Sequence, residues 1–235
     1  MKREAIVLAG GFGTRLRSVI EDVPKPMAPI GDEPFLAHLL RYLSAQKFDH
    51  VVLSVGYLHE KIQDYFGDTF RGLTISYEIE DEPLGTGGAL FASSRHVDSE
   101  SFSVFNGDTM FPVDMDNAYA THKRTGADVT IVVKALENFE RYGTLSFDSE
   151  QQITAFEEKR KVESGYINGG VYVLRQGVLD RAVEGQPRFS LEKDFFEPSV
   201  GKLSMVACPS DAFFLDIGVP EDYERAQHEV PRLTS

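Results

Sequence analysis

Short apolar runs rich in β-branched residues alternate with amphipathic segments through the first 135 residues of this 235-residue chain. The runs predict buried strands, and the segments between them, apolar on one face, predict helices. Such alternation is typical of βαβ units, whose parallel strands form a sheet covered by helices. We expect strands at residues 4–9, 51–55, 73–79, 102–106 and 128–134, and helices at residues 34–46, 59–66, 85–94 and 117–125.

The pattern changes after residue 135, where strand-like runs follow one another with short links. This part predicts a more antiparallel segment and then two further strands, each followed or preceded by a helix. We expect its strands at residues 143–147, 153–158, 166–174, 203–207 and 212–215, and its helices at 191–197 and 220–229. Neither a repeat nor a linker interrupts the chain, so we expect one α/β domain over residues 1–235.

Composition excludes several classes of protein. A hydrophobic content of 42% and a charged content of 26% are ordinary for a globular chain. The single cysteine, Cys208, excludes an internal disulfide framework and a Cys-rich zinc site. No apolar run approaches the roughly 18 residues that cross a membrane. The apolar stretch near the start ends at Gly10 and is too short for a secretory signal, so we expect a cytoplasmic protein.

The net charge of −13 argues against a nucleic-acid or anionic-membrane surface. Its distribution is uneven, because residues 1–30 hold five basic and three acidic side chains. This basic segment contains the glycine-rich turn LAGGFGTRL at residues 8–16, directly after the first predicted strand. Glycines in such a turn let backbone N–H groups approach a phosphate closely.

The turn matches neither of two well-known phosphate loops. It lacks the Lys-Ser/Thr pair of a Walker A loop, and Leu16 stands where a dinucleotide fingerprint needs its third glycine. Lys25 follows between two prolines, which predicts a stiff, extended strut. Arg15 offers a planar fork for phosphate oxygens and Lys25 a point charge. Either feature alone is also typical of an ordinary surface loop.

Together, LAGGFGTRL and PKPM closely resemble the signature of the sugar-phosphate nucleotidylyltransferases. These enzymes join a sugar 1-phosphate to a nucleoside triphosphate and release pyrophosphate. The resemblance covers essentially the whole chain and implies a Rossmann-like, three-layer α/β/α fold with a mixed, mostly parallel central sheet. It implies nucleotide binding by about residues 1–135 and sugar-phosphate binding by about residues 136–235. It places at the nucleotide Leu8, Ala9, Gly10, Gly11, Gly13 and Thr14, and in catalysis Arg15, Lys25 and Asp108.

Two acids, Asp108 and Asp216, each follow a predicted strand. Carboxylates at the carboxyl ends of strands in an open α/β sheet point into the ligand crevice, where two of them could hold Mg²⁺. Alternatively each is a turn or cap residue. In the family, the matching acids bind the metal during direct in-line displacement at the α-phosphorus. The resemblance then implies that Arg15 holds the leaving phosphates and Lys25 neutralises charge near the reacting phosphate.

Later motifs resemble the family's base and sugar contacts. The segment EPLGTGG implies nucleotide contacts by Glu82, Gly85, Thr86 and Gly87, with Glu82 accepting from guanine, and is otherwise a helix N-terminus. The sugar phosphate is implied to meet Gly107, Glu158, Lys159, Asn168 and Gly169. Arg160 stands where the family usually has proline. Without the resemblance, the Glu-Glu-Lys run is typical of a solvated, charged surface segment. Likewise, Asn168-Gly169-Gly170 alone is typical of a bulged strand.

Three segments, RSVIEDVPKPMAPI, FSLEKDF and FLDIGVPEDY, most resemble the family's heptose 1-phosphate guanylyltransferase branch. Mannose-1-phosphate guanylyltransferases, N-acetylmuramate-phosphate uridylyltransferases and thymidylyltransferases of the same family remain alternatives. A nucleotide-sugar-binding regulatory subunit is the alternative that is not an enzyme. A dinucleotide-dependent dehydrogenase conflicts with the missing third glycine. We expect small-molecule substrates and Mg²⁺, with no nucleic acid and no membrane, and leave a homo-oligomer open.

Overall fold

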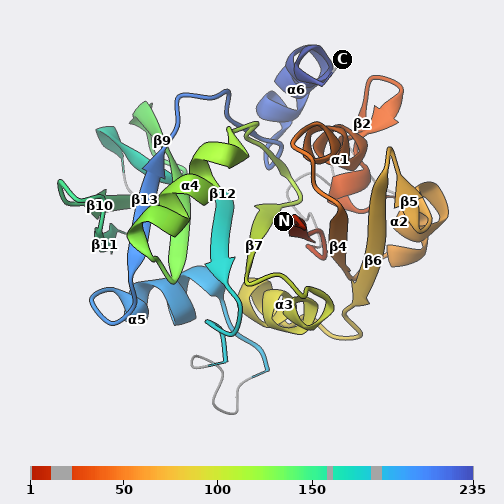
Figure 1. Cartoon of the computed structure of the whole chain (residues 1–235). Helices are drawn as coiled ribbons and strands as arrows, with labels where there is room; N and C mark the ends of the chain where they lie inside the picture. The colour runs from red at the N-terminus through yellow and green to blue at the C-terminus, as the bar shows by residue number, and fades with distance from the viewer. Residues whose placement is uncertain (1, 12–22, 158–160, 181–186, 235) are drawn as a thin grey trace.

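The computed structural model describes residues 2–11, 23–157, 161–180 and 187–234. A ten-stranded sheet forms its centre (Figure 1). Strands β1, β4, β6 and β7 pair in parallel in the order β6-β4-β1-β7, which confirms the predicted βαβ arrangement. Their bounds are Glu4–Leu8, His50–Val55, Leu73–Ile79 and Ser101–Asn106, and the short antiparallel β5 (Thr69–Phe70) lies at the edge.

The other half of the sheet is built on β12 (Val162–Arg175). This strand runs antiparallel to β7 on one side and to β9 (Val129–Phe139) on the other. Strand β13 (Met205–Pro209) pairs in parallel with β9, and the hairpin of β10 (Thr144–Phe147) and β11 (Ile153–Glu157) extends from the first part of β12. Because β12 reverses direction, β9 and β13 run the same way as β1, so the sheet is mixed and mostly parallel, as predicted.

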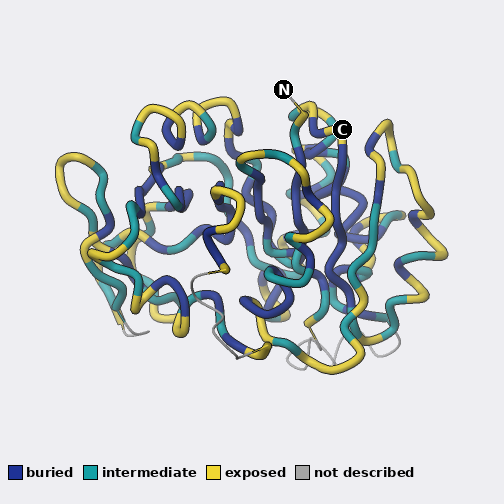
Figure 2. The backbone as a smooth tube through the Cα atoms, turned by 60° about the horizontal axis from the view of Figure 1, so that its bottom comes forward, coloured by how far each residue is buried: buried dark blue, intermediate teal, exposed yellow. Residues whose placement is uncertain are grey.

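Helices cover both faces of the sheet and give the expected three layers (Figures 1 and 2). Successive residues of β1 point to opposite faces, so Val7 belongs to one buried cluster and Ile6 to the other. Four helices contribute to the cluster of Val7: α1 (Phe35–Ala45), α2 (His59–Phe66), α4 (Met115–Thr125) and α6 (Pro220–Leu233). The cluster of Ile6 packs against α3 (Gly85–Ser93), which continues into η3 (Ser94–His96), and against the π-helix η4 (Leu191–Phe196) with α5 (Glu197–Ser199).

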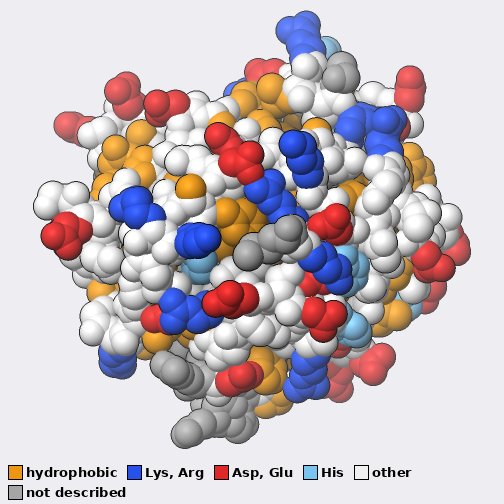
Figure 3. Space-filling view, viewed as in Figure 1, with side chains coloured by type: hydrophobic (Ala, Val, Ile, Leu, Met, Phe, Trp, Pro, Cys, Tyr) orange, Lys and Arg blue, Asp and Glu red, His pale blue; other side chains and the backbone are white. Residues whose placement is uncertain are grey.

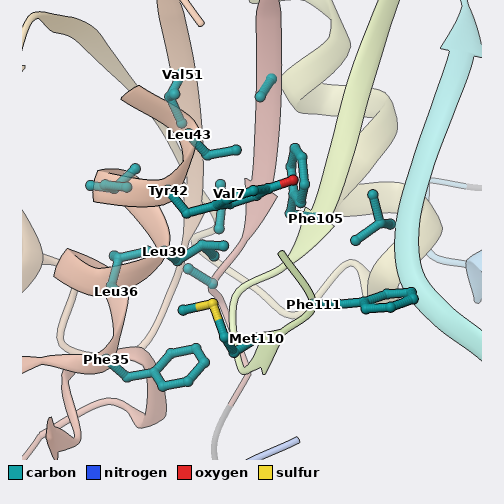
Figure 4. Close-up of a cluster of buried hydrophobic side chains, with 14 of the residues drawn as sticks. Val7, Phe35, Leu36, Leu39, Tyr42, Leu43, Val51, Phe105, Met110 and Phe111 are labelled. Atoms are coloured by element: carbon teal, nitrogen blue, oxygen red, sulfur yellow. The ribbon is translucent and has the colours of Figure 1, made fainter. Parts of the chain in front are cut away.

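The larger cluster fixes α1 against the strands that lead to the candidate site (Figure 4). Phe105 of β7 lies at its centre, with Tyr42 and Phe48 packed edge-on at centroid distances of 6.2 and 5.9 Å. The Tyr42 hydroxyl donates to the carbonyl of Val113 at 2.7 Å. Burying one such side chain contributes roughly 1.5–3 kcal/mol. Packing around Phe105 therefore fixes the end of β7, from which the chain continues to the candidate site.

Several predicted elements need correction. The helix predicted from Pro34 begins at Phe35, because Pro34 is extended and serves as its N-cap. The segment predicted as a helix at 191–197 is π-helical up to Phe196. The strand predicted at residues 212–215 is wrong apart from its end, since only Leu215–Asp216 (β14) pairs, with β8 (Thr109–Met110). The short hairpin of β2 (Pro29–Ile30) and β3 (Glu33–Pro34) was not predicted, since two-residue strands have no hydrophobic period.

Acidic and basic side chains are interspersed on the face of the molecule shown in Figure 3. Among the described residues, no helix has both the length and the apolar character needed to span a membrane.

Candidate active site

Two neighbouring cavities open where β1 and β7 end. The smaller, of about 300 Å³, is lined by the backbone that follows β1 and by the start of α3. The predicted nucleotide residues in its wall are Leu8, Ala9, Gly10, Gly11, Gly85, Thr86 and Asp108, together with Lys25 and Gly107. The larger cavity, of about 520 Å³, extends over β10 and β12 and includes the predicted residues Asn168, Gly169 and Asp216. Both cavities share Thr86, Asn106 and Asp108, so their contents would meet at Asp108.

Asp108 and Asp216 come together although they lie far apart in the sequence. Strand β14 pairs with β8 so that Asp216 is opposite Thr109, and the Ile217 N–H donates to the Asp108 carbonyl at 3.0 Å. Lys25 reaches both carboxylates, with its Nζ 2.5 Å from Asp108 Oδ2 and 3.5 Å from Asp216 Oδ1. Its side chain is only 10% exposed. One lysine and two acids therefore form a compact charged cluster at the junction of the cavities.

The local backbone around Lys25 differs from the prediction. Pro24 is extended, but Lys25–Met27 forms a single 3₁₀ turn (η2) and not a straight strut. The Met27 N–H donates to the Pro24 carbonyl at 2.7 Å. Pro26 occupies a first-turn position where its missing N–H is not needed, so the turn is compatible with both prolines. The lysine is still held rigidly, by a turn in place of an extended segment.

The electrostatics of the cluster suit a divalent cation. Burial and then the charge of Asp108 raise the pKa of Asp216, while Lys25 acts in the opposite direction. Two carboxylates with one ammonium leave an unbalanced negative charge, and carboxylate oxygens are the ligands that Mg²⁺ prefers. Within the described residues, no group of three or more His, Cys, Asp or Glu side chains could hold a metal. The donor set thus fits an ion that takes its other ligands from water and phosphate.

Gly107 is needed because the backbone after β7 passes directly beside the end of β1. Its N–H donates to the Leu8 carbonyl at 2.9 Å, and a Cβ at this position would lie 2.7 Å from the same oxygen. A side chain would push the two strand ends apart. Since Asp108 follows immediately, this close approach sets its position in the same cavity wall as Gly10 and Gly11 after β1.

The glycines of LGTGG have two different roles. Gly85 and Thr86 line the smaller cavity, while Gly87 and Gly88 face the segment before η4. A Cβ on Gly87 would lie 2.2 Å from the Phe189 ring, and its N–H donates to the Phe189 carbonyl at 3.0 Å. Gly87 therefore contributes to the packing of Phe189 onto α3, and the nucleotide contact that the resemblance implies for it stays a prediction.

Besides Asp108, the acid in the wall of the smaller cavity is Glu80, while Glu82 is exposed. Glu80 follows β6, and its Oε2 accepts from the Leu84 N–H at 3.1 Å. Burial raises its pKa. Sequence reasoning missed this residue, yet the signal was present, because Glu80 stands just past the carboxyl end of a predicted strand, where ligand-facing side chains are expected.

Several residues that line the larger cavity were not predicted from the sequence. Some predicted site residues, in turn, lie outside the part of the chain that the structure describes. Ser190 and Glu192 line the larger cavity and belong to the FSLEKDF segment, which had suggested only a branch of the family. Tyr142 lines it as well, packed edge-on against Phe214 at 5.7 Å. Asn168 lies at a register shift in β12, which agrees with a bulged strand. The residues Gly13, Thr14, Arg15, Glu158 and Lys159 fall outside the described part of the chain.

Comparison with known proteins places the chain in a family. It belongs to the nucleotidyl transferase family, whose model matches residues 4–232. It is 44% identical to the D-glycero-alpha-D-manno-heptose 1-phosphate guanylyltransferase of Aneurinibacillus thermoaerophilus, over 97% of this chain and 98% of that protein. The enzyme of the same name from Campylobacter jejuni is also 44% identical, over 94% and 96%. The crystal structure of HddC from Yersinia pseudotuberculosis superposes with a TM-score of 0.87 at 34% identity, covering 97% of this chain and 99% of that one.

Proposed function

We propose that this protein transfers GMP from GTP to D-glycero-D-manno-heptose 1-phosphate and releases pyrophosphate. The observation that carries the proposal is the junction of two cavities at Asp108, with Lys25 and Asp216 beside it. One cavity would hold the nucleotide and the other the sugar phosphate, so the reacting groups would meet at the charged cluster. Two relatives with 44% identity carry this activity in their names, and HddC is also known complexed with GMP-PN. We place the reaction in the cytoplasm, in the synthesis of cell-surface polysaccharide.

The same geometry supports a division of labour along the chain. The smaller cavity is lined by residues from Leu8 to Asp108, within the proposed nucleotide part of about 1–135. The larger cavity draws most of its wall from residues beyond Tyr142, in the proposed sugar-phosphate part of about 136–235. We treat the two parts as halves of a single domain, because β12 and β9 join them in one sheet.

The chain's own groups would promote displacement by position and charge. Asp108 and Asp216 would hold Mg²⁺, which would supply charge neutralisation for the phosphates. Lys25, fixed by its turn, would offset the charge that develops as a sugar-phosphate oxygen approaches the α-phosphorus. The N–H groups of the glycine turn would bind phosphate oxygens, and Arg15 would hold the leaving phosphates. No covalent protein intermediate is required.

Guanine selection is assigned to Glu80. Guanine presents two neighbouring donors, N1–H and the 2-amino group, and a carboxylate can accept from both. Glu80 lies in the wall of the smaller cavity, directly beside Gly10, since a Cβ on Gly10 would lie 2.5 Å from its Oε1. The exposed Glu82 is less suited to this contact.

The proposal is tested by measuring pyrophosphate release with four nucleoside triphosphates against several sugar 1-phosphates in the presence of Mg²⁺. We expect release with GTP and the manno-heptose phosphate, and none when the divalent ion is chelated. Preference for mannose 1-phosphate would change the sugar assignment alone. A strong preference for UTP or dTTP would remove the guanine assignment but not the reaction class.

A further inference from the structure

The segment FSLEKDF, residues 189–195, builds one wall of the larger cavity. Leu191, Phe195 and Phe196 of η4 are buried in the cluster beneath the sheet, while Ser190 and Glu192 face the cavity. Phe189 is fastened to α3 through hydrogen bonds with the Leu84 carbonyl and the Gly87 N–H. π-helical turns are rare and often occur at functional sites. The buried residues of this π-helical turn fix its backbone, so Glu192 is held in a defined position in the cavity wall.

Glu192 is held through one of its two carboxylate oxygens. Its Oε2 accepts from the Thr86 and Ser190 hydroxyls, each at 3.3 Å. The Thr86 hydroxyl is itself oriented, because its oxygen accepts from the Leu191 N–H at 2.9 Å. Between described residues, no hydrogen bond or ion pair involves the other oxygen, Oε1. The carboxylate is therefore oriented and still has acceptor capacity.

Glu192 differs in this respect from the other acids at the junction. Asp108 and Asp216 both lie beside the Lys25 ammonium, whereas the described contacts of Glu192 are to neutral hydroxyls. Its charge is also felt by the fully buried Tyr172, since burial and then Glu192 raise the pKa of that phenol. A charged acceptor in a cavity of this size suits a hydroxyl-rich ligand, and hydrogen bonds to ionised acceptors are about twice as strong as neutral ones.

We propose that Glu192 accepts a hydroxyl of the acceptor sugar and helps to select the sugar 1-phosphate, and that Thr86 is the positioning residue that orients it. The inference rests on the proposed function of the larger cavity as the sugar site. Thr86 belongs to the walls of both cavities. A residue of the proposed nucleotide cavity would therefore also orient Glu192 toward the sugar.

The test compares steady-state kinetics of Glu192→Gln with the wild type, using GTP and D-glycero-D-manno-heptose 1-phosphate. We expect the KM for the sugar phosphate to rise about tenfold or more, and the KM for GTP to stay within about twofold. Thr86→Val should raise the sugar KM as well, and Thr86→Ser, which keeps the hydroxyl, should restore it. In the Glu192→Gln background, Thr86→Val should add little to the sugar KM, because the two residues act through one contact.

Glu197→Gln is the matched control, since it removes the same charge from the same cavity wall, at the far end of η4. We expect a clearly smaller rise in the sugar KM from this variant. Equal effects of the two variants, or a parallel rise of both KM values in Glu192→Gln, would overturn the inference while leaving the proposed function in place. A wild-type protein that turned over none of the sugar 1-phosphates would overturn both.

Discussion

Lys25 is the residue on which the charge balance of the site depends. It is the ammonium that reaches both Asp108 and Asp216, and its side chain is almost fully buried. Removing a group that stabilises developing charge costs roughly 10²–10³ in rate. We expect Lys25→Ala to lower kcat by at least about 100-fold, and Asp108→Asn to do the same, with circular dichroism unchanged.

Lys202→Ala provides the comparison, because Lys202 is exposed and absent from the walls of both cavities. Its pyrophosphate-release rate should match that of the wild type. Activity within a few-fold of wild type in a folded Lys25→Ala protein would remove the lysine from the mechanism.

The proposed selection of guanine also rests on a single residue, Glu80. A carboxylate at Glu80 can accept from both guanine donors, whereas an amide can accept only on its oxygen. We expect Glu80→Gln to lose about 10- to 100-fold in kcat/KM for GTP. ITP lacks the 2-amino group, so the preference of the wild type for GTP over ITP should shrink in the variant. Competition assays with the two nucleotides measure this preference directly, and Glu82→Gln should leave it intact.

At the scale of elements, α3 packs against the segment before η4 next to Thr86, which lines both cavities. An added methyl group at Gly87 would overlap the Phe189 ring, which is buried. Overpacking of this kind typically costs 1–3 kcal/mol. We expect Gly87→Ala to lower the free energy of unfolding in urea by about that amount and to raise the KM for the sugar phosphate.

A double-mutant cycle isolates the cause. In a Phe189→Ala background the space beside Gly87 is empty, so Gly87→Ala should then cost little, and its alanine favours the helix. If the loss of unfolding free energy in the double variant equalled the sum of the losses in the two single variants, the added methyl group would not act through the Phe189 ring.

Local signals predicted most elements, and they failed where tertiary contacts decide. The runs of β4, β6 and β7 and the apolar face of α1 are strong periodic signals, and each was predicted to within a residue or two. Strand β14 has two residues and exists only because β8 pairs with it, so no pattern in residues 212–215 could locate it.

The same distinction holds for the site. Asp108 and Asp216 were predicted because each follows a strand, but their shared contact with Lys25 depends on the pairing of β8 with β14. Gly87 looks like part of a ligand loop in sequence, and its role in packing shows only when Phe189 is placed beside it. Glu192 lies in FSLEKDF but was not predicted as a site residue, because its contact with Thr86 joins two residues that are distant in sequence.

For the whole molecule, we expect two buried groups away from the site, His122 of α4 and Glu4 of β1, to make stability fall in acid. His122 hydrogen-bonds to Thr130 inside the fold, and burial lowers its pKa to about 4 from an ordinary 6.5. A histidine kept neutral in the folded state binds its proton more readily when unfolded. Its contribution to stability is therefore complete above about pH 6.5 and is lost as the pH falls toward 4.

Glu4 adds a second, more acidic step. Burial alone would raise its pKa, but the ammonium of Lys2, the imidazole of His50 and the hydroxyl of Ser99 lower it to about 2. The ionised form is thus favoured by folding, and the stability it contributes is present above about pH 4.5 and lost as the pH falls toward 2. A shift of this size corresponds to about 3 kcal/mol.

We expect Glu4→Gln to lower the free energy of unfolding by about 2–3 kcal/mol at pH 7 and by roughly half as much near pH 3, because at pH 3, between the unfolded and folded pKa values of Glu4, the wild type has lost part of this contribution. Urea titrations at pH 7, 5 and 3 measure this convergence. Glu60→Gln, which changes an exposed glutamate, should run parallel to the wild type throughout. Glu4 begins β1, whereas Leu8 at the other end of the strand lines the smaller cavity, so kcat at pH 7 should be unaffected in the folded variant. If the free energy of unfolding of Glu4→Gln differed from that of the wild type by the same amount at all three pH values, the ionised Glu4 carboxylate would not be the source of this acid-sensitive stability.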